Sequence, residues 1–278
     1  MGAGQCPYLG AGVRLVASYL EVCETAVRRA GRLLLDRRGH VTVRHKGRAD
    51  LVTEADLAAQ EVVRETILEA FPDHALLGEE DPPDRQDPGR QGAFCWIVDP
   101  LDGTTNYVHG VPFFSVSLAL EHRGELLAGA IYDPISEECF ASERGGGAFL
   151  NGRPIRVSGV LTLADALVAA GFPAAVTGDA PDLRLFNEIV LVCQAVRRTG
   201  SASLNLAYVA AGRLDALWSY ATKVWDVAAG RLLIQEAGGV VTAFNGKPPG
   251  SRDGQVLAAA TPKLHEELLL VVRRLGLR

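Results

Sequence analysis

The apolar positions near the start of the chain recur at helical spacing, with arginines between them. This pattern predicts an amphipathic helix over residues 13–35. A short strand is predicted at 41–43, followed by a basic, glycine-broken loop at 45–48. A second helix is predicted between Thr53 and Pro72, because its apolar residues again share one face.

The middle of the chain changes to short apolar runs that turn residues separate. Residues 94–98 have the aromatic and β-branched content of a buried strand, and Pro100 is expected to end its pairing. Apolar runs on either side of glycine-containing turns predict one hairpin over 113–132 and another over 139–150. We therefore expect an antiparallel sheet over 94–157, backed by the two N-terminal helices.

After about residue 157 strands and helices alternate. The predicted strands are 166–171, 214–218, 240–244 and 256–260, and the predicted helices are 181–196, one beginning near Ser201, 225–236 and one beginning at Thr261. Alternation of this kind is typical of an α/β domain. The sequence thus predicts an α+β domain over 1–157 followed by an α/β domain over 158–278.

Composition restricts the classes of function. The chain has 278 residues, 48% of them hydrophobic, so it can bury a large core. Its 28 basic and 33 acidic residues are interspersed, so direct binding to nucleic acid is not expected. The five cysteines form no CxxC pair, which argues against a disulfide framework or a zinc site. No apolar run approaches the roughly 18 residues of a membrane span, and we expect a cytoplasmic protein without membrane contact.

The stretch 96–106, WIVDPLDGTTN, runs an apolar strand into two carboxylates and a glycine-opened turn. Asp99, Asp102 and the carbonyl of Leu101 are hard oxygen ligands of the kind that Mg²⁺ prefers. A helix predicted from Thr104 would present its first N–H groups to a phosphate. The alternative is a plain turn in which both aspartates bond their own backbone.

Three separated stretches resemble one family. Residues 96–106 are similar to the central signature of the inositol monophosphatase family, whose members are Mg²⁺-dependent, lithium-sensitive phosphomonoesterases. Residues 50–56 and 225–230 resemble two further signatures of that family, in the expected order. The resemblance covers about 13–275 and implies the layered αβαβα architecture of the sugar phosphatases.

The resemblance also implies a set of metal ligands and catalytic groups. Two or three Mg²⁺ ions would be held by Glu79, Asp99, the Leu101 carbonyl, Asp102 and Asp226. Asp56 and Thr104 would polarise the attacking water, and Glu79 belongs with them as a catalytic residue. Each distant acid has a simpler alternative: Asp56 as a helix-capping residue, Glu79 as part of a solvated acidic run, and Asp226 as an acid at a helix N-terminus.

Substrate contacts follow from the same resemblance. Asp102 and the amides of Gly103 and Thr104 would hold the phosphate end, with Lys46 near the mouth of the site. The corresponding segment in family enzymes binds the substrate alcohol, and here it is Gly200, Ser201 and Ala202, although plain helix initiation is the alternative. Inositol-hydrolysing members carry a glutamate seven residues before the late aspartate, where this chain has Ser219.

Two classes of function remain. The first is a phosphomonoesterase acting on inositol monophosphate or a close relative, with histidinol phosphate, a nucleotide 3′-phosphate or fructose bisphosphate as alternatives. The second is a non-enzymatic role as a binding partner of a transcription complex. A homodimer is expected in either case, and the acids in place favour the enzyme.

Overall fold

The computed structural model describes residues 18–40, 42–47, 50–82, 94–173 and 175–277, with the side chains of 45–47 and 50 left undescribed. The α-helices are α1 (Tyr19–Arg37), α2 (Glu54–Ala70), α3 (Thr104–Val108), α4 (Pro181–Ile189), α5 (Ala202–Ala210), α6 (Val224–Glu236) and α7 (Pro262–Arg274), with a short 3₁₀ turn η1 (Leu163–Asp165). The strands are β1 (Val43–Gly47), β2 (Asp50–Thr53), β3 (Ala75–Gly78), β4 (Cys95–Asp102), β5 (Ser115–His122), β6 (Glu125–Asp133), β7 (Glu138–Glu143), β8 (Gly147–Leu150), β9 (Arg153–Pro154), β10 (Leu167–Ala170), β11 (Ala195–Arg197), β12 (Ala216–Ser219), β13 (Val240–Thr242) and β14 (Val256–Ala259).

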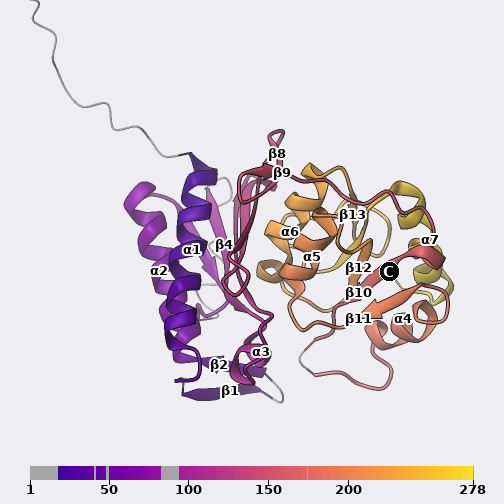
Figure 1. Cartoon of the computed structure of the whole chain (residues 1–278), viewed down its shortest axis with the longest axis horizontal. Helices are drawn as coiled ribbons and strands as arrows, with labels where there is room; N and C mark the ends of the chain where they lie inside the picture. Colours follow the sequence, from indigo (N-terminus) through magenta and orange to yellow (C-terminus); the bar gives the residue numbers. More distant parts are fainter. Residues whose placement is uncertain (1–17, 41, 48–49, 83–93, 174, 278) are drawn as a thin grey trace, which may run out of the picture.

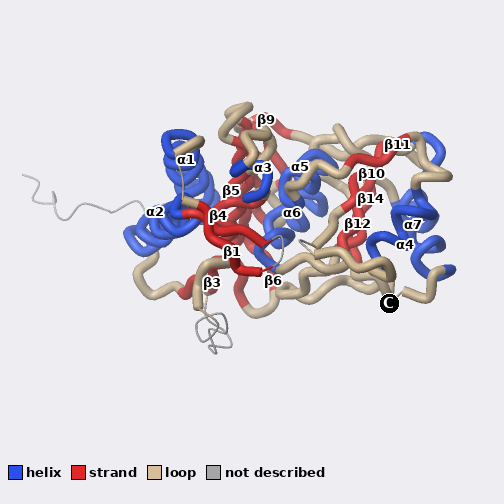
Figure 2. The backbone as a smooth tube through the Cα atoms, turned by 90° about the horizontal axis from the view of Figure 1, so that it is seen from below, coloured by secondary structure: helices blue, strands red, loops and turns tan. Residues whose placement is uncertain are grey.

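The elements form alternating layers of helix and sheet (Figure 1). Helices α1 and α2 cover one face of a seven-stranded sheet of order β3-β4-β5-β6-β7-β8-β9. Helices α5 and α6 lie between that sheet and a five-stranded sheet of order β11-β10-β12-β14-β13, whose other face packs on α4 and α7 (Figures 1 and 2). The predicted αβαβα fold class is therefore confirmed.

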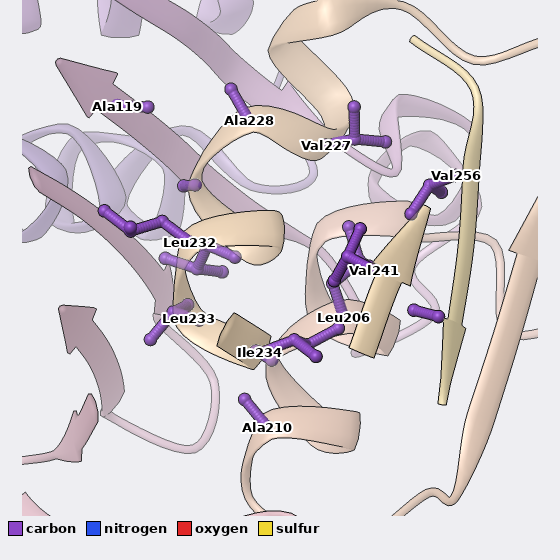
Figure 3. Packing of buried hydrophobic residues seen from close by; sticks show 14 of the residues in the cluster. Ala119, Leu206, Ala210, Val227, Ala228, Leu232, Leu233, Ile234, Val241 and Val256 are labelled. Atoms are coloured by element: carbon purple, nitrogen blue, oxygen red, sulfur yellow. The ribbon is translucent and has the colours of Figure 1, made fainter. Parts of the chain in front are cut away.

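The middle helical layer has apolar residues on every side, because it is covered by a sheet on both faces (Figure 3). Leu232, Leu233 and Ile234 of α6 are fully buried. Glycine lets α6 approach its neighbours closely, since a Cβ added at Gly230 would lie 2.4 Å from the Cβ of Leu206 on α5. This core crosses the predicted domain boundary near residue 157, and the division into two domains stays a prediction.

Helix α2 begins at the predicted capping box, and α1 begins at a second capping box that was not predicted. Ser18 caps α1 in a full capping box with Glu21, and Thr53 caps α2 in another with Asp56. Residues 13–17 of the predicted first helix and position 41 of the predicted short strand lie outside the described residues. No helix in the described ranges is long and apolar enough to cross a membrane.

One predicted helix is wrong in its second half. The helix predicted over 181–196 ends at Ile189, and residues 195–197 instead form β11, which pairs in parallel with β10. Val190, Leu191 and Val192 follow the helix as a turn in which Leu191 is 80% exposed. The pairing of Ala195–Arg197 with β10 overrides the helix predicted for this segment.

Three smaller predictions about the strands are also wrong. The basic segment predicted as a loop at 45–48 is strand as far as Gly47. The sheet is not wholly antiparallel, because the unpredicted strand β3 pairs in parallel with β4. Pro100 does not end the pairing of β4, which continues to Asp102 through an irregularity between the pairs Asp99–Ser117 and Asp102–Ser115.

Helix α4 carries a buried carboxylate that should respond to pH. Asp182 is fully buried and its Oδ1 accepts a hydrogen bond from the Tyr220 amide at 2.8 Å, whereas Oδ2 has no partner among the described residues. Burial raises the pKa of Asp182 to about 6. The folded state therefore binds this proton more tightly than the unfolded state, and the stability that it contributes is lost as pH rises from about 4 to about 6.

We expect Asp182→Asn to raise the free energy of unfolding at pH 8 by roughly 2 kcal/mol, because the amide keeps the Tyr220 hydrogen bond without burying a charge. The difference from the parent protein should shrink toward zero at pH 4, where both side chains are neutral. Urea titrations at the two pH values measure it. A variant that is less stable than the parent at pH 8 would contradict the assignment.

Candidate active site at the end of β4

The site is built where β4 leaves the seven-stranded sheet. Every residue of β4 is buried, including Asp99 and Asp102. The Leu101 amide donates to Asp99 Oδ1 at 3.0 Å, which fixes the carboxylate against its own strand. Gly103 then turns the chain with φ of 94°, where a Cβ would also lie 3.1 Å from the Phe113 carbonyl oxygen. This turn begins α3, a helix of only five residues.

Three carboxylates from separate elements converge beside this turn. Glu79 follows β3, Asp99 is in β4 and Asp226 is in the first turn of α6, and one oxygen from each lies within 4.8 Å of the others. Burial, and then the charges of Glu79, Asp102 and Asp226, raise the pKa of Asp99 well above its usual value. Burial and the charge of Asp102 likewise raise the pKa of Asp226.

The donor set fits a divalent cation. Clustered carboxylate oxygens are the preferred ligands of hard ions such as Mg²⁺. The same cluster is electrostatically unfavourable by itself, because each charge raises the pKa of the next. A cation would remove that cost. The structure thus brings together three of the predicted metal ligands, Glu79, Asp99 and Asp226.

Asp102 is turned toward α5 rather than into the group of three. Its carboxylate accepts hydrogen bonds from the Ser203 amide at 2.8 Å, the Ser203 hydroxyl at 2.5 Å, the Ala202 amide at 3.2 Å and the Ser201 hydroxyl. Ser203 is itself held by the Ser115 hydroxyl at 2.7 Å. Asp102 therefore connects the proposed metal site, through hydrogen bonds, to residues 201–203, which overlap the segment expected to hold the substrate alcohol.

We expect Ser203→Ala to weaken Mg²⁺ binding about tenfold, because groups that orient a metal ligand typically contribute that much to affinity. Isothermal titration calorimetry with MgCl₂ measures the change. Ser142→Ala is the matched control, since the Ser142 hydroxyl is equally buried and has no described hydrogen-bond partner. Equal Mg²⁺ affinity in Ser203→Ala and the parent protein would show that Asp102 needs no such support.

Asp56 and Thr104 lie together at the other side of the turn. Asp56 is 1% exposed, and its Oδ2 accepts from the Thr53 amide at 2.8 Å and the Thr53 hydroxyl at 2.6 Å. Its Oδ1 lies 3.3 Å from the Thr104 hydroxyl, which is also 3.0 Å from the Leu101 carbonyl oxygen. Asp56 therefore caps α2 and contacts Thr104 at once, so the two interpretations of this residue are compatible.

A cavity of about 630 Å³ opens above these groups. Its lining comes from both halves of the chain, namely Leu51, Glu79, Gly103, Thr104, Thr105, Asn106, His109, Ala170, Gly171, Phe172, Pro173, Arg198, Thr199, Gly200, Ser201, Ala202, Asn205 and Thr222. Asn106 joins the halves, because its side-chain amide donates to the carbonyls of Phe113 at 2.7 Å and Thr199 at 2.9 Å. The predicted contacts Gly103, Thr104 and Gly200 to Ala202 all line this cavity.

Of the predicted substrate contacts, Ser219 is placed differently, and the position of the Lys46 side chain stays a prediction. Ser219 is fully buried and is absent from the described lining, because its hydroxyl lies beneath Gly171, where a Cβ would approach it to 2.4 Å. The side chain of Lys46 lies outside the described residues. Sequence reasoning gave no role to Asn106 or Phe172, although Asn106 closes the central signature and could have been found there.

A sequence model described as the inositol monophosphatase family matches residues 16–276. The chain belongs to this family. An inositol-1-monophosphatase of Rhizobium meliloti is 44% identical over 234 residues, covering 83% of this chain and 87% of its own length. A protein of Pseudomonas aeruginosa named Nus factor SuhB is 42% identical over 260 residues, covering 91% and 95%. The crystal structure of the extragenic suppressor protein suhB from Bartonella henselae superposes with a TM-score of 0.86 at 38% identity, covering 93% and 99%. Inositol monophosphatase family membership supports a phosphatase.

Proposed function

We propose that this protein is a Mg²⁺-dependent phosphomonoesterase that hydrolyses inositol monophosphate or a closely related small phosphate ester. The observation that carries the proposal is the convergence of Glu79, Asp99 and Asp226 beside the Asp56 and Thr104 pair, next to one cavity. Carboxylates in a group of three are ligands for divalent cations, and a polarised hydroxyl beside them is suited to hold a water. Together they provide what metal-assisted hydrolysis of a phosphate ester requires.

The metal ligands in this proposal are Glu79, Asp99, the Leu101 carbonyl, Asp102 and Asp226, and they would hold two or three Mg²⁺ ions. Mg²⁺ bound there supplies Lewis-acid activation of water and neutralises charge on the phosphate. Asp99 has the most central place, since it is buried and responds to the charges of three other acids.

The protein's own groups position the nucleophile and the ester. When the Thr104 hydroxyl donates to Asp56, its oxygen can accept a hydrogen bond from the attacking water, and this bond would orient the water's lone pair toward phosphorus. The amides of Gly103 and Thr104, two residues that line the cavity, would donate to phosphate oxygens. Gly200, Ser201 and Ala202 line the side of the cavity where the leaving alcohol would lie.

A phosphate-release screen in millimolar Mg²⁺ tests the proposal. The substrates are inositol 1-phosphate, histidinol phosphate, a nucleoside 3′-phosphate and fructose 1,6-bisphosphate. We expect release from at least one of them, its loss in EDTA and inhibition by Li⁺. Release that persists unchanged in EDTA, or no release from any phosphomonoester, would overturn it.

A second candidate function rests on the relatives named Nus factor SuhB, including those of Pseudomonas aeruginosa and Escherichia coli. It is a role as a binding partner of a transcription complex, and it does not need the carboxylates. The two functions are separable, because a variant without Asp99 would lose hydrolysis and keep its outer surface. We also propose a homodimer, which sedimentation velocity would test.

A further inference from the structure

Two consecutive arginines, Arg197 and Arg198, lie at the carboxyl end of the edge strand β11, and only Arg198 is among the described lining residues of the cavity. Arg197 ends β11, is exposed, and donates to the carbonyl of its own neighbour Val196 at 3.1 Å. Arg198 lines the cavity that also contains Glu79 and Thr104. Both arginines are exposed, and they differ in that Arg198 lines the cavity whereas Arg197 is not among its described lining residues.

Arg198 is held over an aromatic ring. Its guanidinium carbon lies 5.1 Å from the centroid of the Phe172 ring, and both residues line the cavity. β10 and β11 are parallel neighbours, with Ala169 opposite Arg197, so Phe172 and Arg198 both follow the carboxyl ends of these strands. In open α/β sheets this end is where ligands bind.

The backbone behind Arg198 is fixed from two directions. The Thr199 carbonyl accepts from the Asn106 amide at 2.9 Å, and the Thr199 hydroxyl donates to Asn205 at 2.7 Å. Gly200 has φ of 91°, and a Cβ there would lie 2.8 Å from the Asn106 side chain. A planar guanidinium on a fixed backbone and an aromatic support loses little freedom when it binds an oxyanion.

The guanidinium of Arg198 can bind a ligand anion, because no described carboxylate pairs with it. Among the described lining residues Glu79 is the acid, and it belongs to the group of three carboxylates. Arg198 has no carboxylate partner within the described part of the chain. The cavity of about 630 Å³ also exceeds what one phosphate needs. The remaining volume leaves room for the alcohol part of a substrate beside Arg198.

We propose that Arg198 is a specificity-determining residue that binds a second oxyanion, a phosphate or a carboxylate, on those phosphomonoesters of the proposed substrate class that carry one. The inference rests on the proposed phosphomonoesterase function. Arg198 does not take part in the bond cleavage. It binds the far end of the substrate, so its contribution should appear mainly in KM.

Matched substrate pairs test this in the Mg²⁺-loaded enzyme. Fructose 1,6-bisphosphate against fructose 1-phosphate differs by one phosphate, and 3-phosphoglycerate against glycerol 3-phosphate differs by one carboxylate. We expect Arg198→Ala to lower the ratio of kcat/KM within at least one pair by about 10- to 100-fold, the usual value of a lost charge-assisted bidentate contact. The pair that responds identifies the oxyanion. Arg198→Lys should restore part of the ratio.

Arg197→Ala is the matched control, because it removes the same charge from the neighbouring residue, which is not among the described lining of the cavity, and should leave both ratios as in the parent protein. If Arg198→Ala lowers both members of each pair equally, or leaves both ratios unchanged, the inference is wrong although phosphomonoesterase activity stands. If the parent protein hydrolyses no phosphomonoester at all, the proposed function itself fails, and the two failures are thus distinguishable.

Discussion

Asp99→Asn is expected to lower phosphate release about 10³-fold or more, since a bound metal supplies several kcal/mol to the transition state and each 1.36 kcal/mol corresponds to a factor of ten. The substitution keeps the size of the side chain and the acceptor for the Leu101 amide. It removes the charge at the centre of the carboxylate group. The effect should therefore fall on metal binding and turnover and not on the fold.

Thermal unfolding separates these outcomes. Mg²⁺ should raise the melting temperature of the parent protein, because it binds only the folded state, and should have little effect on Asp99→Asn. In EDTA the variant should melt at the same temperature or higher, because one of several mutually repelling charges is gone. Asp133→Asn is the control, a buried aspartate that caps the turn at Ile135 outside the cavity and should retain turnover. An active Asp99→Asn would exclude Asp99 as a ligand.

The sequence was sufficient to predict the fold because its local signals agree with one another. The hairpins, the capping box at Thr53, and the alternation of strands and helices after residue 157 each involve residues close in the chain. The helix predicted over 181–196 was wrong for the converse reason. Its second half pairs with β10, a partner that no local pattern identifies.

In the candidate site, too, the features set by neighbouring residues were predictable and those set by distant contacts were not. Asp99, Leu101 and Thr104 share one turn, so spacing alone brings them close. The position of Asp226 beside Glu79 and Asp99 depends on how α6 packs, and only the family resemblance predicted it. The hydrogen bonds from Ser201 and Ser203 to Asp102 span about a hundred residues and carry no sequence signal. Burial of Ser219 under Gly171 could not be predicted either, because it depends on two adjacent strands.

Thr104→Ala is expected to lower kcat by about 10² to 10⁴, the usual contribution of a residue that positions a proton transfer. Thr104 is a better test of water activation than Asp56, because Asp56 also caps α2 and its loss would cost about 0.5–2 kcal/mol of stability. Thr104 is partly exposed at the cavity, so its removal should leave the melting temperature nearly unchanged.

The conservative substitution Thr104→Ser distinguishes a catalytic hydroxyl from a packing methyl group. Serine can donate to Asp56 in the same way and should recover most of the lost kcat, while Mg²⁺ affinity measured by calorimetry stays as in the parent protein. The Thr104 hydroxyl also lies 3.0 Å from the Leu101 carbonyl, so a fall in Mg²⁺ affinity in Thr104→Ala would assign its effect to the metal site instead. If alanine and serine variants are equally slow, the hydroxyl is not the group that matters, and the attacking water must be oriented by other residues.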